Sequence, residues 1–212
     1  MITVAQLGLI STLGVAYFGF VFALLHFLDP ATDAVGRAGS EYVLGPYGVL
    51  MTTCFLALGL ALATVAAAFG RVLPASRAWA GFAIAAVGLV VVAVIPTDRG
   101  VAATTTSGLI HNLTGLVSFL AVVISEVGLS RAMRHNTRLA AYANGFSRLA
   151  LLATATFVLV FLAAGPFVSV GVFGLAQRLF LACALLWIFL ASLRLRAISM
   201  PAHADTTGIV RV

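Results

Sequence analysis

Six long apolar runs, separated by short polar connectors, constrain this chain more than any other feature of its sequence. They cover Val4–Phe27, Val43–Phe69, Trp79–Ile95, Ser107–Ser130, Ser147–Phe167 and Val172–Leu193. Each run offers the ~17–25 residues with which a helix crosses a hydrocarbon core about 30 Å thick. Because lipid offers the backbone no hydrogen-bond partners, segments that cross it as single runs are helical. The sequence therefore predicts an all-α, polytopic integral membrane protein with six transmembrane helices in one bundle.

The composition supports this class. Apolar residues make up 62% of the chain, charged residues make up 8%, and the mean hydropathy is +1.15. A soluble domain would carry about 25% charged residues. We expect a single transmembrane domain at residues 1–198, followed by a short polar C-terminal tail at 199–212. The first run has no basic segment before it, so we expect a membrane span there and not a cleaved signal peptide.

The basic charges are all arginines, and they are distributed unevenly. The connectors after the second and fourth runs, with the C-terminal segment, carry nine: Arg71, Arg77, Arg131, Arg134, Arg138, Arg148, Arg194, Arg196 and Arg211. The other side carries three, Arg37, Arg99 and Arg178, beside the acidic Asp29, Asp33, Glu41 and Asp98. The positive-inside rule places both termini in the cytoplasm. The net charge of +6 is thus a topology signal that attracts anionic lipid, and no nucleic-acid partner is predicted.

Polar side chains near the outer ends of the runs form the first candidate site. An ionisable group inside the membrane is costly, so each requires a partner or a function. We expect a polar, outward-facing pocket built from Glu41, Asp98, His111, Asn112, Gln177 and Arg178. Within it we predict that Arg178 contacts Asp98 first and Glu41 or Asp29 second, with His111 nearby.

A metal site is an alternative use of the same region. Two imidazoles and two carboxylates, from His26, Asp29, Asp98 and His111, suffice to bind zinc. Their spacing matches no established zinc motif such as H-E-x-x-H. The sequence leaves three interpretations open: mutual pairing of these groups with Arg178, a metal or acid–base site, and a polar pocket without chemistry.

Three further residues lie deeper in the predicted spans. Glu126 stands near the cytoplasmic end of its run, where we expect it to pair with Arg131, Arg134 or Arg148. Cys54 and Cys183 fall inside predicted spans, where small apolar residues serve helix packing. A disulfide or a metal pair between them is the alternative.

Several cofactor classes are excluded by the residues that the chain contains. Without lysine there is no Schiff base, and hence no retinal. Bis-histidine haem ligation across the bilayer needs histidines at two depths. His26 and His111 share the outer side, whereas His135 and His203 lie in inner polar segments. The sequence also lacks a glycine-rich phosphate loop and a nucleophile elbow.

Three separated stretches resemble one bacterial membrane family. They are Ser40–Met51 with Cys54–Gly59, Ile95–Asp98 with Thr104–Asn112, and Gly174–Leu179 with Leu186-Trp187. Together they resemble the domain-of-unknown-function family 998, which usually has an aromatic residue where this chain has Val49. The resemblance implies a six-helix, multi-pass protein of the bacterial plasma (inner) membrane. It implies no particular reaction.

These observations lead to three functional hypotheses. The leading one is a non-catalytic pocket that binds or handles a lipid or small amphiphile. The second is a membrane-embedded metal-dependent hydrolase or lipid-modifying enzyme that uses His26, Asp29, Asp98 and His111, with zinc as the possible cofactor. The third is an accessory subunit that packs against a larger membrane-protein complex.

Overall fold

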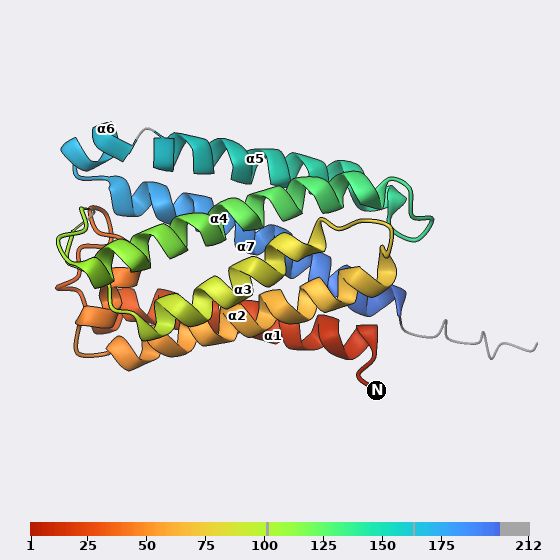
Figure 1. Cartoon of the computed structure of the whole chain (residues 1–212), viewed down its shortest axis with the longest axis horizontal. Helices are drawn as coiled ribbons and strands as arrows, with labels where there is room; N and C mark the ends of the chain where they lie inside the picture. Colours follow the sequence, from red (N-terminus) through yellow and green to blue (C-terminus); the bar gives the residue numbers. More distant parts are fainter. Residues whose placement is uncertain (101, 163, 200–212) are drawn as a thin grey trace, which may run out of the picture.

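The computed structural model describes residues 1–100, 102–162 and 164–199, in which the secondary structure is helical with connecting loops. The elements are α1 (Val4–Leu28), η1 (Gly39–Leu44), α2 (Gly48–Val72), α3 (Trp79–Val94), α4 (Thr106–Met133), η2 (Ala140–Tyr142), α5 (Ala143–Leu162), α6 (Ala164–Ser169) and α7 (Phe173–Ile198). No strand occurs within these residues. The helices form one elongated bundle (Figure 1). Most of the predicted tail, with His203 and Arg211, lies outside the described residues.

Five segments are long and apolar enough to cross a membrane: α1, α2, α4, η2 with α5, and α7. They indicate a multi-pass membrane protein, as the sequence predicted. The remaining long helix, α3, is equally apolar but has only 16 residues. At 1.5 Å per residue it extends roughly 24 Å, somewhat less than the hydrocarbon core.

Two helix boundaries differ from the predicted runs, and proline explains both. The second run begins with the last two residues of η1 and then a break, so that α2 begins only at Gly48. Pro46, in this break, has no N–H to donate and cannot continue a helix from η1. The fifth run is divided as well: α5 ends at Leu162, and Pro166 lies in the first turn of the separate helix α6, where proline is tolerated.

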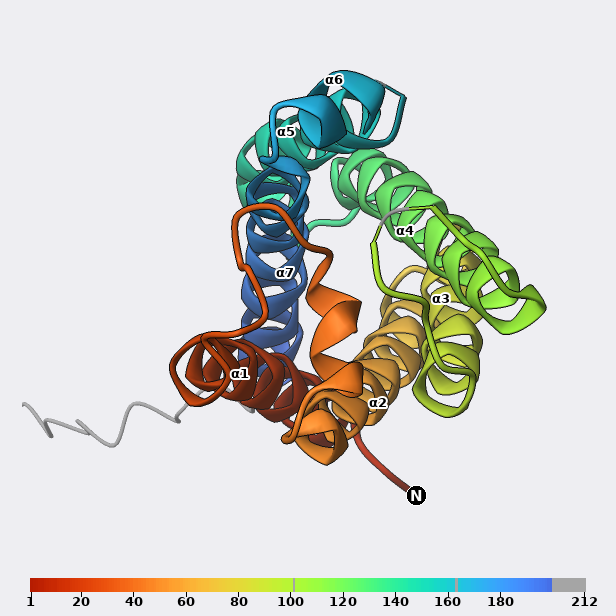
Figure 2. The same ribbon diagram turned by 90° about the vertical axis from the view of Figure 1, so that its left-hand side faces the viewer.

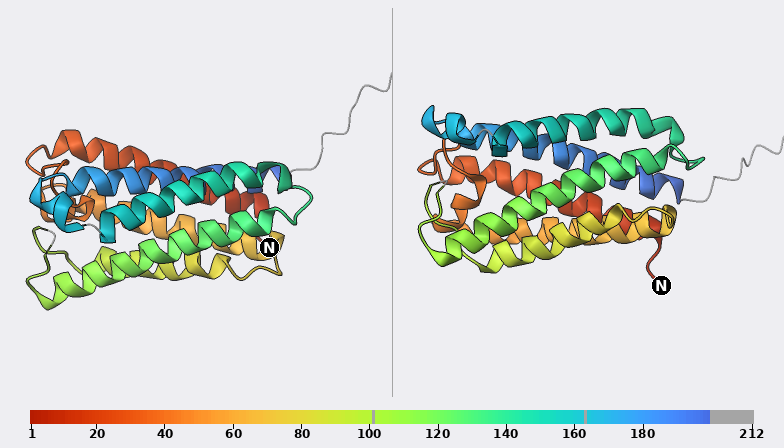
Figure 3. Two further views of the ribbon diagram at one scale, coloured as in Figure 1. Left: turned by 90° about the horizontal axis from the view of Figure 1, so that it is seen from above. Right: turned by 45° about the horizontal axis from the view of Figure 1, so that its top comes forward.

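The six long helices form a closed ring. Each packs against the next in the chain, from α1 to α5, then α5 packs on α7 and α7 packs back on α1. Figure 2 looks down the axis of this ring and shows η1 lying across its middle. The two views of Figure 3 show that all six helices run along the long axis of the bundle.

The two ends of the bundle differ in composition. The N-terminus, the end of α7 and the α2–α3 and α4–α5 connections share one end (Figure 1), which we call the arginine-rich end. The described arginines there are Arg71, Arg77, Arg131, Arg134, Arg138, Arg148, Arg194 and Arg196. The opposite end holds the α1–α2 loop with η1, the α3–α4 loop and α6.

Small residues allow the helices of the ring to approach closely. On the α3–α4 interface, a Cβ added at Gly81 would lie 2.5 Å from the carbonyl oxygen of Ala121, and one added at Gly88 would overlap the Ser118 hydroxyl. On the α1–α7 interface, the hydroxyls of Ser11 and Ser192 form a buried 2.7 Å hydrogen bond. Such contacts are typical of helix packing in lipid, where apolar side chains gain little from leaving the hydrocarbon.

Candidate functional site

A cavity of about 250 Å³ lies inside the ring, in the half that is farther from the arginine-rich end. Apolar side chains form most of its wall, and phenylalanine and leucine are the commonest, including Phe18 of α1, Phe55 of α2, Leu89 of α3 and Phe173 of α7. Residues 38–40, which enter η1, line the cavity on the side of the loops. The α1–α2 loop therefore covers a mainly apolar chamber.

Toward the arginine-rich end the interior of the ring is filled. Trp187 of α7 is fully buried and packs against Phe69, Phe82 and Phe146, with ring centroids 6.0, 5.8 and 5.2 Å away. Its indole N–H donates to the Ser130 hydroxyl and to the carbonyl oxygen of Phe146, both at 3.1 Å. This aromatic plug confines the cavity to one half of the bundle.

Polar groups occupy part of the cavity wall. They are Ser40, Thr97, His111, Asn112, Ser118 and Gln177. Three of these, His111, Asn112 and Gln177, are among the pocket candidates named from the sequence. No lining residue in the described part of the chain carries a formal charge at neutral pH apart from what a histidine can acquire. The cavity wall therefore carries a few polar groups and no permanently charged one.

The orientation of His111 follows from one hydrogen bond. Its Nδ1 lies 2.7 Å from the carbonyl oxygen of Ile95, at the end of α3. Because a carbonyl oxygen only accepts, Nδ1 carries the proton, and in the neutral ring Nε2 is then an acceptor. The ring packs edge-on against Phe55, with centroids 6.2 Å apart. His111 thus joins α4 to the end of α3 and brings an acceptor nitrogen to the cavity.

Gln177 has a similar double role. Its side-chain oxygen accepts from the backbone N–H of Gly39 at 2.8 Å, which leaves the amide NH₂ as a donor at the cavity wall. The side chain is 8% exposed. Gln177 therefore fixes the start of η1 and offers a donor on the wall that α7 contributes.

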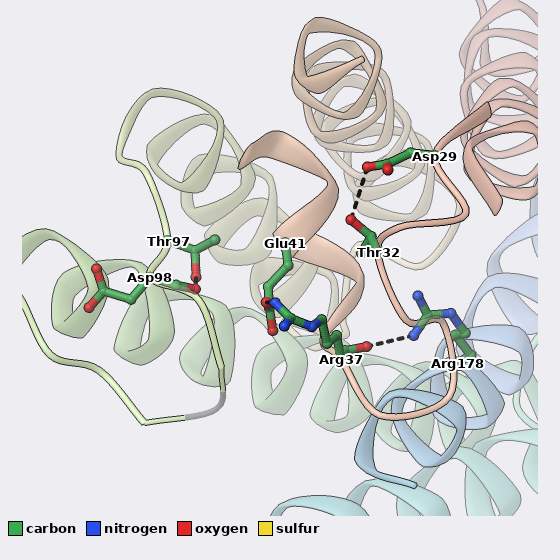
Figure 4. Close-up of polar contacts among 7 residues, drawn as sticks. All are labelled: Asp29, Thr32, Arg37, Glu41, Thr97, Asp98 and Arg178. Atoms are coloured by element: carbon green, nitrogen blue, oxygen red, sulfur yellow. Dashed lines mark hydrogen bonds and ion pairs between the residues drawn. The ribbon is translucent and has the colours of Figure 1, made fainter. Parts of the chain in front are cut away.

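Arg178 does not form the ion pair predicted for it. Its Nε donates to Nε2 of His26 at 2.8 Å, and its Nη1 donates to the carbonyl oxygens of Arg37 and Gly174 at 2.9 and 3.0 Å. Figure 4 shows Asp98 and Arg178 on opposite sides of η1. The predicted contact between them was wrong, because a backbone loop and a histidine supply the acceptors that the guanidinium needs.

Arg178 instead secures the α1–α2 loop. Its guanidinium lies over the rings of Phe22 and Tyr42, at 5.3 and 5.9 Å from the ring centres, where the π electrons attract a cation. The loop is held a second time by the backbone N–H of Leu175, which donates to the carbonyl oxygen of Val35 at 2.8 Å. The first turns of α7 thus hold the loop in place above the cavity.

Asp98 organises the start of α4. Its Oδ2 accepts from the backbone N–H groups of Thr104 and Thr105 at 2.7 and 2.8 Å, and its Oδ1 accepts from the Thr105 hydroxyl at 2.8 Å. These bonds, led by the Thr105 N–H, lower the pKa of Asp98 below its ordinary value. The carboxylate lies so close to Gly108 that a Cβ there would overlap it. Asp98 is therefore a helix-start residue, outside the cavity wall.

The other two acidic candidates also have local partners. Glu41 accepts from Arg37 at 3.1 Å, which is the ion pair found among the described residues. Asp29 accepts from the hydroxyl of Thr32 at 2.9 Å (Figure 4). Neither carboxylate forms an ion pair with Arg178, so this part of the prediction was also wrong.

The four candidate metal ligands are not assembled as a site. His26 uses both ring nitrogens within the protein, since Nδ1 bonds the carbonyl oxygen of Phe22 at 2.7 Å and Nε2 accepts from Arg178. Among the described residues, no three histidine, cysteine or acidic side chains stand close enough to share a metal ion. Cys54 and Cys183 are buried free thiols.

Glu126 lies elsewhere than predicted. It is fully buried in α4, and neither carboxyl oxygen has a hydrogen-bond partner within the described residues. The expected pairing with Arg131, Arg134 or Arg148 was therefore wrong. The helix turns this side chain toward the bundle interior, whereas Arg134, for example, reaches out to the exposed hydroxyl of Ser147.

Several lining residues were not found from the sequence. Gly115, Leu116 and Phe119 of α4 line the cavity beside His111, and all lie on one helical face or beside it, at spacings of four, five and eight residues. The available signal was the run of small and polar residues at positions 111, 115 and 118, which share a face. The charged and ionisable residues on which the predicted pocket rests do not extend along this face.

One comparison with known proteins gave a match. A family model described as "Protein of unknown function (DUF998)" matches residues 12–194, a range that contains every residue of the cavity wall. No curated protein and no solved structure matched the chain.

Proposed function

The chain belongs to the DUF998 family of proteins of unknown function, and from its own geometry we propose that it is a six-span inner-membrane protein that binds a lipid or small amphiphile. The binding site is the cavity in the half of the ring away from the arginine-rich end. The arginines orient that end to the cytoplasm, so the cavity faces outward. In this arrangement α3 is the sixth span, and both termini are cytoplasmic.

The observation that carries the proposal is the chemistry of the cavity wall. Ligand pockets combine mostly apolar surface with a few polar groups that fix orientation. Here His111 and Gln177 bring an acceptor and a donor to a wall built mainly of apolar side chains. An amphiphile, whose polar head adjoins an apolar chain, matches both parts of this wall.

The geometry favours this function over a metal-dependent hydrolase. Such an enzyme needs ligands that converge on one ion and an open coordination position. His26 is instead committed to Arg178, and Asp98 is committed to the start of α4. His111 remains in the cavity as a hydrogen-bonding group.

Gly115 provides the experiment. It lines the cavity, and a Cβ added there meets no atom within 4 Å. Gly115→Leu should therefore occupy the cavity and leave the fold intact. Gly19→Leu is the matched control, because Gly19 lies on α1 outside the cavity wall and its added Cβ also meets nothing within 4 Å.

The measurement is native mass spectrometry of protein purified in mild detergent. Wild type and Gly19→Leu should retain a bound lipid, and Gly115→Leu should lose it. Equal retention by Gly115→Leu, or no bound lipid in the wild type, would contradict the proposal.

A further inference from the structure

We infer that the ligand of this cavity is a single-chain amphiphile with an uncharged, hydroxyl-bearing head group, such as a long-chain alcohol or a monoacylglycerol. The inference rests on the proposed function and names the ligand class that the site accepts. It follows from the charge, the hydrogen-bonding groups and the size of the cavity, and each of these excludes a different kind of lipid.

The absence of charge excludes an ionic head group. Among the described residues, no arginine, aspartate or glutamate lines the cavity. Arg178 bonds to His26 and to loop carbonyls, Glu41 pairs with Arg37, and Asp98 bonds to the start of α4. A phosphate or an ammonium in the cavity would lose its water without gaining a counter-charge, which disfavours its binding. A neutral head group avoids this cost.

The hydrogen-bonding groups select a hydroxyl. The neutral His111 ring accepts at Nε2, and the Gln177 amide donates. A hydroxyl both donates and accepts, so a hydroxyl-bearing head group has a complement for either partner. An ether or a methyl ester only accepts, and would leave the His111 nitrogen without a donor.

The size of the cavity limits how much of the ligand is enclosed. An apolar cavity of about 150 Å³ holds one benzene ring in a well-studied case, so the 250 Å³ here encloses on the order of ten heavy atoms. The head group and the first carbons of the ligand fit inside the cavity, and the rest of its acyl or alkyl chain must lie outside it. A diacyl lipid has too wide a glycerol region for this space.

Leu116 lies where the ligand chain leaves the cavity. It lines the cavity and is also 39% exposed. It belongs to the exposed apolar face of α4, which continues through Leu109, Leu113, Leu120 and Ile124. Phe161 and Ala164, at the junction of α5 and α6, line the cavity on the neighbouring side. The chain therefore leaves between α4 and α5–α6 and lies in the bilayer, which is also the route by which the ligand enters.

The test uses tritiated 1-oleoylglycerol and a scintillation proximity assay on the purified full chain. Competitors share the same oleyl or oleoyl chain and differ in the head: oleyl alcohol, its methyl ether, oleate, oleylamine and oleoyl-lysophosphatidate. The alcohol should displace the tracer. The ether and the charged competitors should require about tenfold higher concentrations or more, as expected for an unmade hydrogen bond or an unpaired charge.

Two variants and one control variant locate the effect. Asparagine at position 111 keeps a donor for the carbonyl oxygen of Ile95 and removes the Nε2 acceptor. His111→Asn should therefore weaken tracer binding about fivefold and reduce the preference for the alcohol over the ether. Gly115→Leu should abolish binding, and Gly19→Leu should bind as wild type does.

The outcomes separate the two proposals. If a charged competitor, or the ether, binds as well as the alcohol and Gly115→Leu abolishes that binding, the ligand class is wrong and the binding function stands. Unchanged binding and preference in His111→Asn would likewise overturn the head-group assignment. If no member of the series binds in a manner that depends on Gly115, the proposed function itself fails.

Discussion

The carboxyl group of Glu126 is buried in α4 without a hydrogen-bond partner among the described residues. A buried polar group that lacks a partner costs about 1–3 kcal/mol, because it loses water and gains nothing. Methionine has a similar length and an unbranched, apolar chain, so it fills the same space without this cost. Glu126 therefore weakens the fold at a position where packing alone is needed.

We predict that Glu126→Met raises the melting temperature in detergent by several degrees, as measured from the fluorescence of the native tryptophans on heating. Glu126→Gln serves as the control, since it keeps a polar group of the same shape and should gain less. A melting temperature lower in the methionine variant than in the glutamine variant would show that the carboxyl group has a partner or a bound ligand.

At the same scale, the sequence predicted that Arg178 needs acceptors but not which ones it has. The cost of an unpartnered guanidinium depends on the residue type and on its depth in the membrane, and both can be estimated from the sequence. The choice of His26 and the carbonyl oxygen of Arg37 as acceptors depends on the path of the α1–α2 loop, and this path cannot be read from the sequence. Asp98 was an equally good acceptor by residue type, but its carboxylate accepts hydrogen bonds from the turn before α4.

At the scale of elements, hydropathy placed all six long helices within a few residues, because the apolar length of a span is a local property. It missed η1, because Pro46 near the start of its apolar run is compatible with a continuous helix. It also missed that the end of the fifth run forms the separate short helix α6. The contact of Gly81 with Ala121 on the α3–α4 interface could not be predicted, because it depends on how the two helices pack.

This interface supplies the second prediction. The Cβ of Gly81→Ala would lie 2.5 Å from the Ala121 carbonyl oxygen, so α3 and α4 must separate. Overpacking of this kind costs roughly 1–3 kcal/mol. We expect a fall of several degrees in the melting temperature. In Gly19→Ala, where the added Cβ meets nothing within 4 Å, it should stay level or rise. An unchanged melting temperature for Gly81→Ala would mean that the two helices are farther apart.

At the scale of the whole molecule, the sequence predicted one bundle but not a ring around a cavity. The helices are apolar on nearly every face, so a side that meets lipid, such as the one with Leu113, cannot be told from a side that meets the interior. The order of neighbours around the ring and the gap within it are set by packing between distant segments.

The proposed topology gives the third prediction. Introduced cysteines, Ala75→Cys in one variant and Ala102→Cys in another, would mark the two connections that flank α3. Both positions are exposed. If α3 crosses the membrane, an impermeant maleimide should label Ala102→Cys in intact cells and Ala75→Cys only after lysis. The native cysteines are buried and should react little. Labelling of both variants in intact cells would mean that α3 does not cross.

The closure of the ring also sets an order of assembly. Helices that enter the membrane one after another find their neighbour already present, except α1, whose second partner α7 is the last long helix to be made. Gln177 and Arg178 arrive with α7 and only then fix the loop that follows α1. A nascent chain still on the ribosome therefore has an unclosed bundle and no ligand chamber. Early occupation of the open seam between α1 and α5, by a chaperone or by lipid, would delay maturation without changing a single contact in the finished protein.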